Sequence, residues 1–345
     1  MQAPVQDAIS TESPDSSPLV SATSTPTATP ILYPSEYTIP LKTHVFQTFN
    51  NCGPASLSMA LSYFDINISQ TELGNQLRPY QNPQGDNDDK STTLAELAQK
   101  AEELGFIAYH RPMGDEEIIK KFIANDIPIV TRTITKPDED IGHYRLLRGY
   151  TDEGFIQDDS LQGKGLYYTF SDFNDLWKIY NYEYLAIVPE DNQSVAEGIL
   201  GTFLDENYAW QEAVDNSLQA LKENPNDTYA IFNASVAYYN IGDYQSSIEY
   251  FEKVENQLSM RTLWYQIEPI KAYFEVGNYE KVFSLTDSIL ENHNRAFSEL
   301  YIIRGDIYMN QSLITQAIEE YEKAVFYNAS LLEAKQKLES AYSLL

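Results

Sequence analysis

The most informative segment of this chain is Gln47-Thr48-Phe49-Asn50-Asn51-Cys52-Gly53-Pro54-Ala55, which holds the only cysteine among 345 residues. A lone cysteine cannot form an internal disulfide. Cys52 opens an expected helix, whose N-terminal partial charge and N–H groups stabilise a thiolate. Gln47 can donate its side-chain amide to an oxyanion beside the sulfur. The alternative is a small buried apolar residue, and the flanking residues favour the nucleophile.

The residues that follow predict helices first. Apolar spacing indicates a helix over residues 52–64, with Pro54 in its first turn. Thr93-Leu94-Ala95-Glu96 is a capping-box pattern, and it predicts a second helix that ends at Gly105. Asp115 can cap a third helix.

Strand patterns follow these helices. We expect strands at 127–134, 143–150, 154–157 and 184–188, with a short helix over 171–178. Helices followed by an antiparallel sheet predict an α+β domain, which we place at residues 36–190.

Residues 193–345 predict an all-α domain with an internal repeat. Gly242 and Gly277 are 35 residues apart, and each is followed by Asp or Asn and then Tyr. Ile248 and Ile318 are 70 residues apart, twice that period. The pattern resembles tetratricopeptide repeats, in three to four copies. Such an array either binds a protein partner or only spaces the first domain, and we expect binding.

The composition of the chain limits the kinds of partner that it can bind. The net charge of −28 argues against nucleic acid and anionic membranes. No run approaches the roughly 18 apolar residues of a transmembrane helix. Residues 1–35 are rich in Ser, Thr and Pro and are expected to be a disordered linker. Such tails are common on exported bacterial proteins, so we expect an extracytoplasmic location, although no signal peptide is recognisable.

The chain has four histidines from which a catalytic base can be chosen, His44, His110, His143 and His293. His143 opens an expected strand, and Asp158-Asp159-Ser160 ends the next one. Two adjacent antiparallel strands can place that histidine beside a carboxylate. We expect the carboxylate to accept the imidazole Nδ1–H.

Gln-x4-Cys-Gly-Pro-Ala-Ser, then Gly-His-Tyr, then a strand-ending Asp together resemble a known family. They resemble papain-like cysteine peptidases of the bacteriocin-leader-processing type, and more closely their stand-alone, peptidase family thirty-nine-like relatives, over residues 38–189. The resemblance implies that Cys52 is the nucleophile and that Gln47 and the Cys52 N–H bind the oxyanion. It implies that His143 is the general base and then the acid.

The resemblance also implies that Asp159 orients His143. The family usually has Asp-Pro at this position, and Ser160 replaces the proline here. Asp158 is the alternative. The two carboxylates point to opposite faces of a strand, so only one can serve. We prefer Asp159 because a turn-forming segment follows it directly.

We therefore expect a cysteine hydrolase, a peptidase acting on a peptide or protein substrate, with repeats that bind a protein partner. An amidase or acyl-transfer reaction is a close variant. The rival hypothesis is a catalytically silent papain-like module that acts with the repeats as a protein-binding scaffold. It predicts an unreactive thiol and a blocked pocket at Cys52. Neither a metal nor a cofactor is expected, since no Cys/His cluster or phosphate loop is present in the sequence.

Overall fold

The computed structural model describes residue 1 and residues 33–80, 91–259, 261–292 and 294–345. The expected linker over residues 1–35 lies almost wholly outside the described residues, and so does His293. By contacts along the chain, Ile31–Leu345 form one compact unit.

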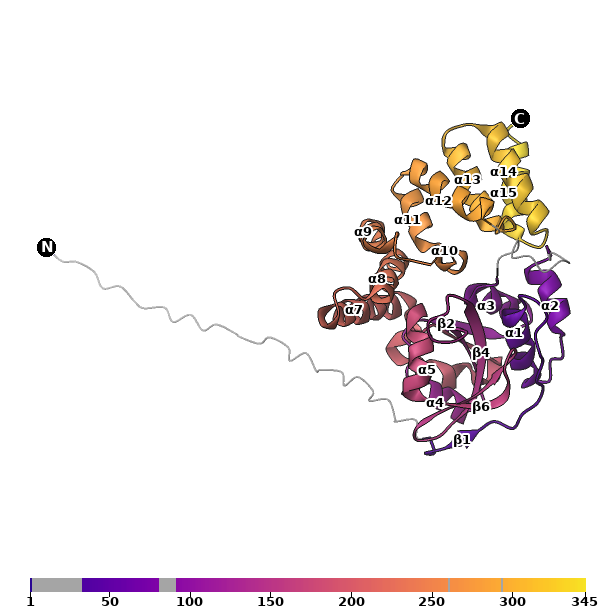
Figure 1. The fold of residues 1–345 in the computed structure, drawn as a ribbon, viewed down its shortest axis with the longest axis vertical. Helices are drawn as coiled ribbons and strands as arrows, with labels where there is room; N and C mark the ends of the chain where they lie inside the picture. The colour runs from indigo at the N-terminus through magenta and orange to yellow at the C-terminus, as the bar shows by residue number, and fades with distance from the viewer. Residues whose placement is uncertain (2–32, 81–90, 260, 293) are drawn as a thin grey trace. The chain divides into compact units, whose positions relative to one another are not determined.

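An antiparallel sheet organises the first part of the described chain (Figure 1). Its strand order is β2-β7-β3-β4-β5-β6, and β1 pairs with the far end of β4. The bounds are β1 Tyr37–Thr38, β2 Ile107–Arg111, β3 Ile129–Ile134, β4 Gly142–Tyr150, β5 Gly154–Asp159, β6 Gly163–Thr169 and β7 Tyr184–Val188. The expected strands are present, and β1, β2 and β6 add to them.

Helices cover both faces of this sheet because its central strands are apolar on both sides. On β7, Leu185 and Ile187 pack in the core with α1 (Cys52–Ser62) and α3 (Leu94–Glu103). Tyr184, Ala186 and Val188 alternate with them and pack in the opposite core, with α4 Glu116–Ala124, α5 Phe170–Trp177 and α6 Gln193–Leu200. This arrangement confirms the predicted α+β class.

Local capping starts the helices near the site. Thr93 and Glu96 form the predicted capping box at the start of α3. An additional helix, α2 (Gln70–Leu77), was not predicted, although Ser69 accepts a hydrogen bond from the Glu72 N–H. The Ser-x-x-Glu spacing at its start is the signal that would have found it.

Helical hairpins form the second part of the described chain (Figure 1). The helices are α7 Glu206–Glu223, α8 Thr228–Asn240, α9 Tyr244–Val254, α10 Thr262–Tyr265, α11 Glu268–Glu275, α12 Tyr279–Glu291, α13 Ser298–Asn310, α14 Ile314–Tyr327 and α15 Leu332–Tyr342. Gly242 and Gly277 stand at the turns with φ of 81° and 77°, which glycine adopts without strain. The repeat prediction is confirmed.

The first helix after the expected boundary at residue 193, α6, packs with the sheet part. Ala196, Ile199 and Leu200 of α6 belong to the core beneath the sheet. The repeat core instead begins with residues of α7 such as Trp210. The reason is that α6 presents its apolar side to α4 and has no preceding repeat helix to pack on.

One repeat helix is broken. α8 ends shortly before Gly242, and the corresponding stretch before Gly277 is divided into α10 and α11. Pro269 lies in the first turn of α11. A proline has no N–H, so it cannot make the bond to the carbonyl four residues earlier that continues a helix.

Hydrogen bonds join the repeats to the sheet part. Asn233 Nδ2 donates to Lys178 O at 2.6 Å, and Asn328 Nδ2 donates to Leu77 O at 3.3 Å. Across the described residues, we find no helix that combines the length and apolar character needed to cross a bilayer.

Candidate active site

Cys52 is the first residue of α1, and its side chain is 4% exposed. The hydrogen-bond pattern of the helix does not use its N–H, which points towards the helix start. A Cβ on the neighbouring Gly53 would lie 2.0 Å from Thr92 Oγ1, so a larger residue there would force the Thr92 side chain to move. The helix start therefore fits closely against the segment that begins α3.

The pKa of the Cys52 thiol lies below its ordinary value. Burial raises it, but the hydrogen bond and charge of His143 outweigh burial. The Ser91 hydroxyl, 4.0 Å from Sγ, and the Gly53 N–H also favour the thiolate. Such a thiol is a nucleophile near neutral pH.

His143 lies between Cys52 and a carboxylate. It stands near the start of β4, is 1% exposed, and its Nε2 is 3.0 Å from Asp159 Oδ1. The expectation that Nδ1 would face the carboxylate is wrong. The reason is the direction from which the neighbouring strand approaches: Asp159 is paired with Arg145, two residues beyond the histidine. Nδ1 is therefore the nitrogen left for the thiol.

The pKa of His143 lies above its ordinary value. Burial lowers this pKa, but the hydrogen bond to Asp159 and the neighbouring Cys52 sulfur raise it by more than burial lowers it. A lowered thiol pKa beside a raised imidazole pKa favours a thiolate–imidazolium pair.

Asp159 is held rigidly as a carboxylate. Its Oδ1 also accepts the Leu161 N–H at 2.7 Å and the Gln162 N–H at 3.0 Å. Arg145 Nε lies 3.2 Å from its Oδ2, and both side chains are fully buried. Burial raises the pKa of Asp159, but His143, Arg145 and the Leu161 N–H bring it down to about 2.

Asp158, the alternative carboxylate, points elsewhere. Its Oδ2 accepts from Arg148 Nε at 2.9 Å, and its Oδ1 accepts from the Gly165 N–H at 2.8 Å. The alternation along β5 thus separates the two acids, and the structure brings Asp159 to His143.

Gln47 lies beside Cys52, and its amide is oriented by Ser160. Ser160 Oγ donates to Gln47 Oε1 at 2.7 Å, and the Gln47 N–H donates to Ser160 O at 2.9 Å. With the oxygen occupied, the amide N–H₂ is the side left to donate. Gln70 of α2 holds the same segment, because its Nε2 donates to Phe46 O at 2.7 Å.

The other described histidines have different surroundings. His44 Nε2 lies 3.0 Å from Asp159 O, and His110 Nε2 lies 3.0 Å from Glu183 Oε2. Neither lines the cavity at the thiol.

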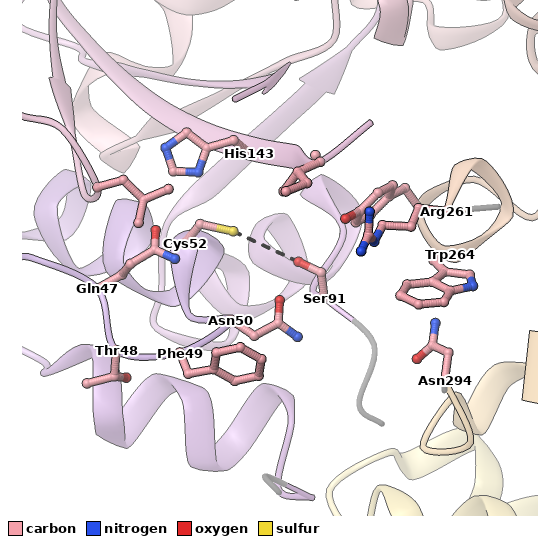
Figure 2. A pocket seen from close by; sticks show the side chains of 14 residues that line it. Gln47, Thr48, Phe49, Asn50, Cys52, Ser91, His143, Arg261, Trp264 and Asn294 are labelled. Atoms are coloured by element: carbon pink, nitrogen blue, oxygen red, sulfur yellow. Dashed lines mark hydrogen bonds between the residues drawn. The ribbon is translucent and has the colours of Figure 1, made fainter. Parts of the chain in front are cut away.

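A cavity of about 360 Å³ opens beside the thiol (Figure 2). One wall carries Gln47, Cys52 and His143, and Ser91 is 9% exposed at its edge. In Figure 2 the repeat part supplies the facing side, with Arg261, Trp264, Tyr265 and Asn294. The sequence reasoning missed this second wall.

The comparisons agree with this fold. Residues 38–185 match the Peptidase_C39 like family, and residues 228–256 and 298–341 match the tetratricopeptide repeat. The first part of the chain therefore has a C39-like α+β fold, and tetratricopeptide repeats follow it, as the sequence motifs predicted. No curated protein matches it.

Three solved structures are similar to parts of the chain. A C39-like peptidase from Bacillus anthracis is 17% identical, with a TM-score of 0.39, over 45% of this chain and 98% of its own. The peptidase domain of Streptococcus ComA, a bifunctional ABC transporter of quorum sensing, is 20% identical, with a TM-score of 0.35, over 44% and 99%. MamA is 21% identical, with a TM-score of 0.35, over 39% and 78%.

Proposed function

We propose that the protein is a cysteine hydrolase that cleaves an amide bond of a peptide or protein. The observation that carries this proposal is the buried row of Cys52, His143 and Asp159, in which His143 Nε2 lies 3.0 Å from Asp159 Oδ1. A cavity of about 360 Å³ beside the thiol argues against the silent module, which requires a blocked pocket.

The first half-reaction forms an acyl-enzyme. The Cys52 thiolate attacks the carbonyl carbon, a C–S bond forms, and the negative charge moves to the oxygen. The Gln47 amide and the Cys52 N–H are the donors for that oxyanion. His143 then gives its proton to the leaving nitrogen, and the C–N bond breaks.

The second half-reaction releases the acid. His143, now neutral, takes a proton from water, and the resulting hydroxide attacks the thioester carbon. The C–S bond breaks, the carboxylic acid leaves with the hydroxide, and the water proton stays on His143, which restores the thiolate–imidazolium pair. Asp159 keeps Nε2 protonated throughout, so that Nδ1 exchanges the proton.

The repeats are proposed to bind the peptide or protein partner, not only to act as a spacer. Support comes from the cavity, which Trp264 and Asn294 of the repeat part line together with Cys52. If a substitution in the repeat part changes the reactivity of Cys52 towards peptides, the repeats bind the peptide. If it does not, they act as a spacer.

Iodoacetamide alkylation of Cys52 tests the chemistry directly, because the chain has one cysteine. Since the thiol pKa is lowered and the imidazole pKa is raised, we expect the rate to persist below pH 7. In His143→Ala the hydrogen bond and charge that outweigh burial are lost, so the thiol pKa rises. The rate at pH 6 then falls about tenfold per unit rise in pKa. His110→Ala, away from the cavity, is the control.

A rate that rises only near pH 8.5, the reference value for an ordinary thiol, would contradict the proposal. It would favour the silent protein-binding scaffold.

We also propose, from the Ser/Thr/Pro-rich composition of residues 1–35, that the protein works outside a bacterial cytoplasm. Fractionation of the producing cells, with immunoblotting of each fraction, tests this. Recovery of the whole pool in the cytoplasm would exclude it.

A further inference from the structure

The repeat part makes a wall of the cavity through the short helix α10, which is separate from α11. In an unbroken repeat helix, residue 269 would donate its N–H to the carbonyl of Tyr265. Pro269 has no N–H, and Arg132 of β3 takes that carbonyl instead, with Nη2 at 2.6 Å from Tyr265 O.

The short helix α10 is fixed against the strand that carries His143. Arg261 Nη1 donates to Asp140 Oδ1 at 2.8 Å, in the loop before β4. A Cβ on Gly142 would lie 3.3 Å from the ring of Tyr265. These contacts hold α10 beside the candidate nucleophile and base, with Trp264 on the cavity.

Asn294 lines the same cavity, and its side-chain amide makes no hydrogen bond to the described residues. Its side chain is 0% exposed, and neither Nδ2 nor Oδ1 has a hydrogen-bond partner among the described residues. A buried amide left unpaired costs about 1–3 kcal/mol. Figure 2 shows Asn294 beside Trp264, on the side of the cavity that faces Cys52.

We propose that Asn294 and Trp264 form a binding site for the backbone of an extended peptide substrate. A carboxamide offers one donor and one acceptor, which are the complements of a peptide C=O and N–H. The indole face supplies apolar contact for the neighbouring side chain. This inference rests on the proposed hydrolase function and makes the repeats part of its specificity.

Two alkylating probes test the site. Iodoacetamide reports the thiolate alone, and acetyl-Phe-Ala chloromethyl ketone presents two backbone amides to the same sulfur. In both, the thiolate forms a C–S bond and displaces a halide. We expect Asn294→Leu to lower the ratio of the peptidyl rate to the iodoacetamide rate about tenfold, the loss of one or two hydrogen bonds.

Asn292→Leu is the matched control, because it is the same substitution at an exposed position of the same loop. Its ratio is expected to equal that of the parent. The thermal midpoint of Asn294→Leu should stay level or rise, since an unpaired buried amide is replaced by an apolar side chain of similar size. If the midpoint falls, Asn294→Ala is measured in its place, with the same expected ratio, because alanine also has no side-chain donor or acceptor.

The outcomes separate this inference from the proposed function. A ratio unchanged in the Asn294 variant, with acid-range iodoacetamide reactivity retained in the parent, overturns the peptide site and leaves the hydrolase standing. If the parent thiol reacts only near pH 8.5, both the peptide site and the hydrolase function are contradicted. A fall confined to the Asn294 variant supports the site.

Discussion

At the scale of single residues, Asp159 is a buried carboxylate that several positively polarised groups surround. Its carboxylate meets His143, Arg145 and two backbone N–H groups while fully buried. Asp159 therefore couples the geometry of the candidate site to the stability of the fold, because the groups that orient the imidazole also hold β5 to its turn.

Asp159→Asn should destabilise the protein in a pH-dependent way. The folded pKa of about 2 lies below the ordinary value, so the contribution is present above about pH 4 and is lost as the pH falls towards 2. We expect the variant to lose about 2 kcal/mol at pH 7. Urea unfolding of parent and variant from pH 7 to 3 measures the difference.

Asp152→Asn, in an exposed turn, serves as the control and should show no such difference. A gap between parent and Asp159→Asn that stays constant, or widens, as the pH falls to 3 would contradict the assignment.

Most residues of the candidate site could be predicted from the sequence, because the local segments around them determine their positions. Cys52 is fixed by a helix start. Strand alternation shows that only one of Asp158 and Asp159 can serve, and the turn after Asp159 favours Asp159. Asn294 and Ser160 escaped it because their surroundings are tertiary. Nothing within Asn294's own segment shows that its amide is buried against a cavity.

At the scale of elements, the expected strands were found because each has apolar or β-branched runs bounded by turns. β6 was missed since it is a partly exposed strand with Gly163 and Gly165 and little apolar alternation. The break between α10 and α11 was missed although Pro269 signals it. The 35-residue period is unchanged across the break, so the repeat pattern gives no sign that the helix is divided there.

Pro269→Ala is expected to rejoin α10 and α11. The new N–H competes with Arg132 for the carbonyl of Tyr265, and Ala234 occupies the equivalent place one period earlier, inside α8. We expect the peptidyl-to-iodoacetamide ratio to fall as α10 leaves the cavity. Far-UV circular dichroism should show added helix, since Ala is about 3 kcal/mol more favourable than Pro in a helix interior.

Pro225→Ala, in the exposed loop between α7 and α8, is the matched control. Added helix together with an unchanged ratio would show that α10 does not shape the binding of peptides.

At the scale of the whole molecule, the main feature is the large negative net charge. A net charge of −28 makes the folded chain repel itself. The cations that are present work at defined places, such as Arg132 and Arg261 between the repeats and the sheet part. The sequence predicted both kinds of domain, but their shared cavity depends on contacts that no local pattern records.

Salt should therefore stabilise the protein. Raising the ionic strength from 0.01 to 0.15 M shortens the screening length from about 30 to about 8 Å. We expect the thermal midpoint to rise by a few degrees, because screened carboxylates repel less. Sodium chloride and sodium sulfate at equal, low ionic strength should act alike. A midpoint that falls with both salts would contradict self-repulsion.

The contribution of the repeats to the cavity has a practical consequence for anyone who truncates the chain. A fragment ending near residue 190 would keep the thiol, the imidazole and the carboxylate, but would lose the side chains of Trp264 and Asn294. Its cleft would lie open on one side. Substrate screens on such a fragment would sample a broader and weaker specificity than that of the chain with its repeats.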